Sequence, residues 1–373
     1  MNKILMLVFT GLIFIFACGK STNHTISKLS STKLSDKLEG SSEMAFPRSG
    51  HSATLLPNGE VLIAGGMEKN REYHNSAEIF SPKTNLFTSV QNLNQKRVGH
   101  SSVLLKDGKV LILGGFGDDG ILSSAELFDP MTGSFTNIES LNFKRGNLSA
   151  TLLNDGTVLI TGGEGESGSP LSSAEIYNPS TGLFTPTGNM NSARTQHTAT
   201  LLDNGKVLIA GGGSYQNPLS SAEIYNPDTK IFTNTGNMSA PICKHAAVKL
   251  NDGNVMILGG SDVNGWNGNY TNTQIYNVQT GVFSKSGDML EARFKITNSV
   301  VLLQSGNILI SGGYKQSEIY DTKENSFNNV NGEMDLARYY STATLLNDGR
   351  VLITGGYDTQ GIATNRAWIF NEQ

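Results

Sequence analysis

Seven near-copies of one short pattern constrain this chain more than any other feature. The copy that starts at His197 reads HTATLLDNGKVLIAGG, which is an apolar run, a turn at Asn204-Gly205, a second apolar run and a diglycine. The seven diglycines begin at Gly65, Gly114, Gly162, Gly211, Gly259, Gly312 and Gly355, so the successive spacings are 49, 48, 49, 48, 53 and 43 residues. A repeat of about 48 residues predicts an array of equivalent structural units rather than separate domains.

Each repeat predicts four short antiparallel strands. In residues 195–238, the two apolar runs at 197–202 and 206–210 hardly alternate with polar residues, which indicates strands that are buried on both faces. A third strand is predicted at 221–225, before an Asn-Pro-Asp-Thr turn, and a fourth begins at Ile231. Four strands in each of seven repeats predict an all-β fold, a seven-bladed β-propeller that occupies residues 34–373.

The two ends of the chain are predicted to close the ring together. The last repeat stops on its third strand at Trp368-Ile369-Phe370, so its fourth strand is missing. At the other end, Met44 precedes Arg48 by four residues, as Met190 precedes Arg194. We therefore predict that residues 34–43 contain the outer strand of the blade formed by residues 338–373, because joining the ends removes exposed sheet edges.

The N-terminus has the features of an export signal. Lys3 precedes an apolar run at residues 4–17, which is too short to span a bilayer and suits the apolar region of a signal peptide. The ending Ile15-Phe16-Ala17-Cys18 resembles a bacterial lipobox, and this resemblance implies removal of residues 1–17 and lipidation of Cys18. Because Phe16 is bulky for a lipobox, ordinary cleavage and secretion stay open.

A short polar segment follows the proposed lipidation site. Residues 18–33 are rich in Ser and Thr, and we expect them to form a flexible tether. Gly19, rather than Asp, follows Cys18, which in lipoproteins of Gram-negative bacteria implies the outer membrane. The expected location is therefore outside the cytoplasm, lipid-anchored to the bacterial outer membrane or secreted.

The aromatic residues of the third and fourth strands carry a family resemblance. The repeats have a diglycine after the second strand and a segment similar to SAEIYNPSTGLFT, which contains an aromatic residue on the third strand and another at the start of the fourth. These aromatic residues are Phe80, Phe128, Tyr177, Tyr225, Tyr276, Tyr320 and Phe370 on the third strand, and Phe87, Phe135, Phe184, Phe232, Phe283 and Phe327 at the start of the fourth. This combination resembles Kelch repeats, most closely those of bacterial secreted proteins and of the galactose oxidase central domain. The resemblance extends from residue 43 to the C-terminus and implies the propeller fold, but a fold does not by itself identify a function.

Several polar residues recur at equivalent positions, and we expect them to be structural. His51, His100, His197 and His245 begin the first strand, where Leu148, Asn298 and Ser341 stand in the other copies. The alternative for these histidines is a ring that faces a ligand. Buried carboxylates require charged partners or several hydrogen-bond donors. The recurring glutamates are Glu78, Glu126, Glu175, Glu223 and Glu318, and the arginines that could pair with them are Arg48, Arg97, Arg145, Arg194 and Arg338.

Candidate ligand-binding residues lie in the loops that differ between the repeats. The loops after the diglycines vary in length and content, and variable loops on a rigid frame usually carry function. The longest, SDVNGWNGNYTNT at 261–273, places aromatic side chains among Asn and Gly, which suits stacking on sugar rings or holding a peptide. Antiparallel strand order predicts that these loops share one face with the connections from the fourth strand to the next first strand. The candidates are Tyr73, His74, Tyr215, Trp266, Tyr270, Tyr314 and Tyr357 in the loops, with Tyr339 and Tyr340 in a connection. Alternatively, Trp266 packs only against the neighbouring blade.

The leading hypothesis for function is a non-catalytic binding module for a protein or a glycan, without a metal ion or cofactor. The net charge of −4, with both signs mixed along the chain, argues against nucleic acid as a partner, and we expect a monomer. One alternative is a galactose-oxidase-like enzyme. That resemblance implies a copper site of two tyrosines and two histidines with a cysteine thioether, but Cys243 is the only cysteine after Cys18 and no histidine follows His245.

Another alternative is a hydrolase or isomerase on the same frame. It requires carboxylates that converge in a central pocket. The loop carboxylates that could do so are Asp118, Asp119, Glu164, Glu166, Asp262 and Asp358.

Overall fold

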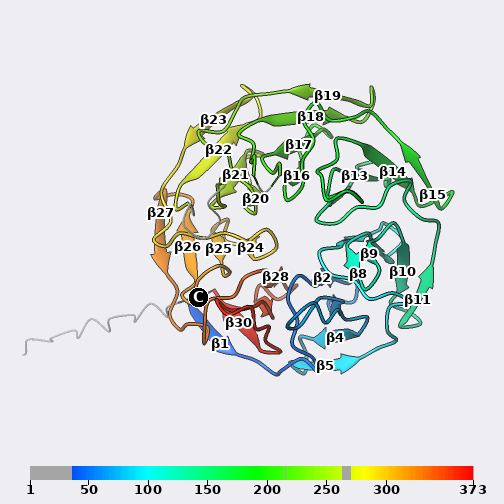
Figure 1. Ribbon diagram of the computed structural model, residues 1–373. Helices are drawn as coiled ribbons and strands as arrows, with labels where there is room; N and C mark the ends of the chain where they lie inside the picture. Colours follow the sequence, from blue (N-terminus) through cyan, green and yellow to red (C-terminus); the bar gives the residue numbers. More distant parts are fainter. Residues whose placement is uncertain (1–35, 215, 263–269, 373) are drawn as a thin grey trace, which may run out of the picture. The chain divides into compact units, whose positions relative to one another are not determined.

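The computed structural model describes residues 36–214, 216–262 and 270–372. The chain divides into two units, Met1–Leu34 and Ser35–Gln373, and the first lies outside the described residues. Within the second unit, seven four-stranded antiparallel sheets are arranged radially around a central axis (Figure 1). This arrangement confirms the predicted seven-bladed, all-β propeller. In the described parts of the chain, no helix has the length and apolar character needed to cross a membrane.

Each blade runs from an inner strand at the axis to an outer strand at the circumference. In that order, blade 1 consists of β2 (Ser52–Leu55), β3 (Val61–Ala64), β4 (Ala77–Ser81) and β5 (Leu86–Ser89). Blade 2 consists of β6 (Ser101–Leu104), β7 (Val110–Leu113), β10 (Ala125–Asp129) and β11 (Ser134–Asn137). Blade 3 consists of β12 (Ser149–Leu152), β13 (Val158–Thr161), β14 (Ala174–Asn178) and β15 (Leu183–Pro186). A small hairpin of β8 (Phe116–Gly117) and β9 (Gly120–Ile121) extends from blade 2.

Blades 4 to 7 follow the same plan. Their strands are β16 (Thr198–Leu201), β17 (Val207–Ala210), β18 (Ala222–Asn226) and β19 (Ile231–Asn234); β20 (Ala246–Lys249), β21 (Val255–Leu258), β22 (Thr273–Asn277) and β23 (Val282–Lys285); β24 (Val300–Leu302), β25 (Ile308–Ile310), β26 (Glu318–Asp321) and β27 (Ser326–Asn329); and β28 (Thr342–Leu345), β29 (Val351–Thr354), β30 (Ala367–Asn371) and β1 (Lys37–Gly40).

The hydrophobic core lies between the blades. Every residue of the second strands, such as VLIT in β13, is buried, because each of their two faces packs against an adjacent blade. The core between blades 2 and 3, for example, joins Leu111 and Leu113 with Val158 and Ile160. The near-continuous apolar runs of the sequence therefore identify strands that are covered on both sides, as expected.

The N-terminal strand closes the ring. β1 pairs antiparallel with β30, with Lys37 opposite Asn371 and Gly40 opposite Trp368. Leu38 is buried in a core with Val330, Trp368 and Phe370. The predicted completion of the last blade by residues from 34–43 is therefore confirmed.

The diglycines allow neighbouring blades to approach closely. Gly162 has a φ of +55°, and a Cβ there would lie 2.3 Å from the carbonyl oxygen of Arg194 and 2.9 Å from Cε1 of His197. Both of these atoms belong to the connection that leads into the next blade. By contrast, Gly182 in a surface turn has a φ of +72°, and a Cβ there would meet no heavy atom of any other described residue, its chain neighbours apart, within 4 Å.

We expect Gly162→Ala to destabilise the protein more than Gly182→Ala does. Both changes force alanine into the left-handed region, which costs about 1–2 kcal/mol, but only the first adds overpacking of about 1–3 kcal/mol. Urea denaturation of the two variants measures this difference. Equal losses of unfolding free energy in the two variants would show that the close approach of the next blade at Gly162 adds nothing to the cost of the substitution.

Buried arginine–glutamate pairs fasten the connections between blades. In blade 3, the Arg145 guanidinium donates to Glu175 at 2.9 Å and to the carbonyl oxygen of Gly162 at 2.8 Å, and both charged side chains are fully buried. Glu175 also accepts hydrogen bonds from the backbone and side chain of Asn142. Equivalent pairs are Arg48–Glu78, Arg97–Glu126, Arg194–Glu223 and Arg293–Glu318.

Two blades depart from this pairing. In blade 5, Ile242 stands in place of the arginine and Gln274 in place of the glutamate, so both charges are lost together. In blade 7 the third strand carries Trp368, and Arg338 pairs with Asp335 instead of a strand glutamate. The predicted pairing of arginine with a third-strand glutamate is therefore confirmed for four of the five arginines named from the sequence and wrong for Arg338. Arg293, which the sequence pattern did not indicate, forms a fifth such pair.

The recurring histidines are structural groups between blades. His100, for example, hydrogen-bonds through Nε2 to the Ser52 hydroxyl of blade 1 at 2.9 Å, and His197 bonds to Thr161 of blade 3 at 2.8 Å. Burial lowers the pKa of His100 and of His245 to about 3, so these imidazoles are neutral.

In blade 6 the assignment of Asn298 to the histidine position was wrong. A Cβ on Gly259 would meet Ile296, as one on Gly211 would meet His245. Ile296 therefore occupies that place in space. Thr297 and Asn298 belong to a turn that precedes β24, and this insertion supplies two of the extra residues in the spacing of 53 before Gly312.

Candidate functional site

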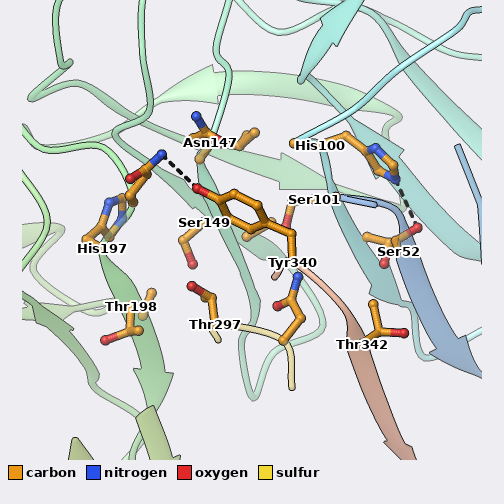
Figure 2. Close-up of a pocket in the computed structure, with 18 of the residues that line it drawn as sticks. Ser52, His100, Ser101, Asn147, Ser149, His197, Thr198, Thr297, Tyr340 and Thr342 are labelled. Atoms are coloured by element: carbon orange, nitrogen blue, oxygen red, sulfur yellow. Dashed lines mark hydrogen bonds between the residues drawn. The ribbon is translucent and has the colours of Figure 1, made fainter. Parts of the chain in front are cut away.

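A polar cavity of about 440 Å³ lies on the propeller axis. Its wall consists of the inner strands and of the residues just before them, and every blade contributes (Figure 2). Hydroxyl groups make up much of this wall, and they come from Ser52, Ser101, Ser102, Ser149, Thr198, Thr200, Thr297 and Thr342. The volume lies within the range of about 300–1,000 Å³ that is usual for ligand pockets.

A ring of seven residues surrounds the mouth of this cavity. We call it the rim ring, and its members are Gly50, Gly99, Asn147, Gln196, Lys244, Lys295 and Tyr340. All seven have left-handed backbone conformations with φ between 50° and 60°. The backbone N–H of each donates to the carbonyl oxygen of the ring member in the preceding blade, at 2.8–3.3 Å, and Gly50 closes the circle by donating to Tyr340.

The rim ring keeps bulky side chains where glycine would fit without strain. Left-handed backbone costs about 1–2 kcal/mol for an L-residue with a Cβ, yet Gln196, Lys244, Lys295 and Tyr340 adopt it. Gly50 and Gly99 show that the same position accepts glycine. Strained residues of this kind are concentrated at functional sites, so the side chains at the rim are the strongest candidates for ligand contact.

The variable loops lie on the same face as the rim ring. Antiparallel bridges join the residue before a ring member to a residue after a diglycine, as in Ser49 with Met67 and Tyr339 with Tyr357. Similar bridges link Val98 with Phe116 and Cys243 with Ser261. The second-to-third strand loops and the fourth-to-first connections therefore share one face, as the sequence predicted.

Tyr340 reaches across the mouth of the cavity (Figure 2). Its hydroxyl accepts a hydrogen bond of 3.3 Å from Nε2 of Gln196, which belongs to blade 4, whereas Tyr340 precedes blade 7. This contact spans the axis and divides the mouth. A ligand that enters the cavity must pass beside this pair or displace it.

An aromatic cluster stands beside Tyr340. Phe294, Tyr339, Tyr340 and Tyr357 surround the ammonium group of Lys295, whose Nζ lies 4.7–5.8 Å from the four ring centroids. Nζ also lies 2.6 Å from the Tyr357 hydroxyl. Burial, together with the nearby charge of Lys244, lowers the pKa of Lys295 to about 8. Lys295 is therefore mostly a cation at pH 7 and loses its charge as the pH rises through 8.

The structure brings together three of the residues predicted from the sequence, namely Tyr339, Tyr340 and Tyr357. The others are dispersed: His74 packs 5.6 Å from the Phe46 ring in blade 1 beside Tyr73, and the Tyr314 ring lies under Arg293. Tyr270 packs against the core between blades 4 and 5. Tyr215 and Trp266 lie outside the described residues.

Sequence reasoning missed Asn147, Gln196, Lys244, Phe294 and Lys295. For all of these except Phe294, a usable signal existed in the residue that precedes each recurring histidine or the residue that replaces it. That residue changes from glycine to asparagine, glutamine or lysine between copies, although the residues around it repeat. A single position that varies inside an otherwise repeated segment therefore indicates a candidate ligand-binding residue, just as a loop of variable length does.

Comparison with known proteins places the chain among Kelch proteins. A profile described as the KLHDC2/KLHL20/DRC7 Kelch-repeats domain matches residues 5–212, and the Kelch motif matches residues 194–239. The chain belongs to the Kelch-repeat family. No curated protein sequence matches this Kelch propeller.

Solved structures share its fold. A fungal alcohol oxidase of the AA5 family, solved in complex with copper, superposes with a TM-score of 0.71 at 16% sequence identity, over 89% of this chain and 76% of the oxidase chain. At this identity the likeness concerns the fold alone. Because 1105 chains of solved structures match, the fold does not select one function.

The residues of the Kelch propeller do not fit a copper site of the galactose-oxidase type. Its buried histidines are held apart by different blades, and Cys243 is a buried thiol against Ser261. Burial raises the pKa of that thiol. Within the described ranges, no three His, Cys, Asp or Glu side chains gather closely enough to hold a metal ion.

The loop carboxylates do not converge on the cavity. Asp118 pairs with Lys96, and Glu166 pairs with Lys144. Asp358 is buried in its own loop, where it accepts hydrogen bonds from the backbone of Gln360 and Ile362. Burial raises the pKa of Glu164, but this residue is not part of the cavity wall. No Asp or Glu is found among the described residues that line the cavity.

Proposed function

We propose that this Kelch propeller is a non-catalytic binding module that takes part of a glycan into its axial cavity. The observation that carries the proposal is the rim ring, which holds polar and aromatic side chains in strained positions around a hydroxyl-lined cavity. Hydroxyl and amide groups both donate and accept hydrogen bonds, as sugar hydroxyls do. The half-buried Tyr340 supplies an aromatic face at the mouth for stacking on a sugar ring.

A glycan array probed with the purified protein tests this proposal. We expect saturable binding that weakens about tenfold or more in Tyr340→Ala and in Gln196→Ala, because each loses hydrogen bonds or contact area at the mouth. Tyr73→Ala, in the loop of blade 1, serves as the matched control and should change the affinity less than twofold. Binding that survives both mouth variants would place the ligand elsewhere.

A protein partner is the second candidate. Phe46, Phe143, Leu290 and Leu336 are 44–50% exposed at related positions in the fourth-to-first connections, around the loop face. Exposed apolar side chains grouped on one face are typical of protein-binding surfaces. A partner that binds through these residues would lose affinity in Phe143→Ser and Leu336→Ser but not in Gln196→Ala.

An enzymatic role has a direct test. The carbohydrate-active alternative predicts that the protein, loaded with copper, releases hydrogen peroxide from galactose. We expect no such release, because the histidines are divided among blades and hydrogen-bonded between them. Copper-dependent peroxide formation would overturn the non-catalytic proposal.

We further propose that the protein is exported and anchored to the outer membrane by a lipid on Cys18. This proposal is supported by the apolar run at residues 4–17 and the lipobox-like ending. Labelling of expressing cells with a fatty-acid analogue should mark the wild-type protein and not Cys18→Ala, and the variant should leave the membrane fraction. Equal labelling of both proteins would refute lipidation at Cys18.

A further inference from the structure

The axial cavity has a basic residue in its wall and a second one beside it in the rim ring. Lys244 is the one Lys, Arg, Asp or Glu residue among the described lining residues, and its ring neighbour Lys295 donates its backbone N–H to the Lys244 carbonyl oxygen at 2.8 Å. His100 and His197 also line the cavity, but burial lowers the pKa of each far enough to keep it neutral. The charge of Asp262 acts on Cys243 and Tyr270, and Asp262 is not among the described residues of the cavity wall.

The two lysines are placed side by side at a cost. Both have a φ of +57°, in the left-handed region where glycine would be unstrained. The charge of Lys244 also acts against protonation of Lys295, so the like charges repel each other. An anionic ligand beside these two ring positions would reduce the repulsion between the lysines.

We propose that the ligand of the axial cavity is an acidic sugar, whose anionic group binds at Lys244 and Lys295 while its hydroxyl groups face the Ser and Thr lining. This inference rests on the proposed glycan-binding function and names the class of glycan. A carboxylate or a sulfate on the sugar supplies the same charge.

The surroundings of Lys295 fix the position of its ammonium group before an anion binds. Tyr357 and the rings of Phe294, Tyr339 and Tyr340 hold its ammonium group in place, so little side-chain freedom is lost when an anion binds. An anion beside Lys295 stabilises the protonated amine. Binding near pH 8 should therefore draw a proton from solution, and the affinity should fall as the pH rises through 8, because the free protein then loses this charge.

Calorimetry with three matched oligosaccharides tests the inference. The first carries uronic acid carboxylates, the second is its carboxyl-reduced neutral counterpart, and the third carries sulfate on the neutral backbone. At pH 7 we expect the acidic sugar to bind about tenfold or more tightly than the neutral one. Lys244→Met and Lys295→Met should each remove this preference for the acidic sugar. Lys323→Met, at an exposed turn distant from the rim, should retain it.

Proton uptake is a readout that a merely structural lysine would not give. Titrations at pH 8 in phosphate and in Tris, which differ in ionisation enthalpy, should show uptake of up to about half a proton by the wild-type protein and none by Lys295→Arg. Equal affinity for the acidic and neutral sugars would overturn the inference and leave the proposed function standing. Binding of no sugar, or of an acidic peptide alone, would overturn the proposed function as well. Preference for the carboxylated over the sulfated sugar, or the reverse, identifies the anionic group.

Discussion

A chain that begins at Ser41 should lose most of its stability, whereas one that begins at Asp36 should keep it. The first truncation removes β1, the outer strand of blade 7, and with it the four-residue pairing to β30. It also removes Leu38 from a core with Trp368 and Phe370. Loss of a buried leucine alone costs about 2–5 kcal/mol, and the total stability of a domain is about 5–15 kcal/mol.

The truncated chain should also aggregate, because β30 becomes an unprotected edge with free backbone groups. Thermal unfolding followed by circular dichroism, together with size-exclusion chromatography, measures both effects. Leu38→Asp in the full chain keeps β1 but places a charge in its buried position. This variant should lower the midpoint temperature of thermal unfolding, by less than the truncation does. Melting of the two truncated chains at the same temperature would show that closure by β1 is dispensable.

Glu175→Ala should destabilise the propeller by about 3–5 kcal/mol, because it leaves the Arg145 guanidinium buried without its carboxylate. The carboxylate also accepts two hydrogen bonds from Asn142, in the connection that leads out of blade 2. Removal of this carboxylate therefore also breaks the hydrogen bonds that link the end of blade 2 to blade 3. Urea denaturation monitored by fluorescence measures the loss.

The chain itself offers the matched control for this prediction. Blade 5 carries Ile242 and Gln274 at the two positions, and Gln274 still accepts a backbone hydrogen bond from Ser239 at 2.8 Å. The double variant Arg145→Ile with Glu175→Gln copies that arrangement and should recover much of the lost stability, since no buried charge remains. A double variant as unstable as Glu175→Ala would show that the ion pair contributes more than charge compensation.

The fold was predictable because several independent features of the sequence indicate the same architecture. The period of the diglycines, the turn residues and the missing fourth strand after Trp368 all point to a closed ring, and β1 closes it as expected. Blade 6 is misaligned when its register is counted back from Gly312, because a two-residue insertion at Thr297 and Asn298 intervenes. Counting forward from Arg293, which is buried with Glu318, yields the correct register.

The site was predictable only in part. Tyr339, Tyr340 and Tyr357 are predicted from the sequence as aromatic residues of the loop face, and they meet around Lys295. The rim ring was not foreseen, because its closed circle of backbone hydrogen bonds and its left-handed conformations leave no side-chain pattern in a single repeat. Its members come from seven places some 48 residues apart, and only the closed propeller brings them together.

Binding at the rim ring, rather than in the outer loops, can be tested with one ligand identified on the array. The measurement compares its dissociation constant for the wild-type protein and for Gln196→Ala, Tyr340→Phe and Tyr73→Ala. We expect a loss of about tenfold for Gln196→Ala, a smaller loss for Tyr340→Phe, which keeps the ring but not the hydroxyl, and less than a twofold change for Tyr73→Ala. Unchanged affinity in the two rim variants with a large loss in Tyr73→Ala would contradict binding at the rim.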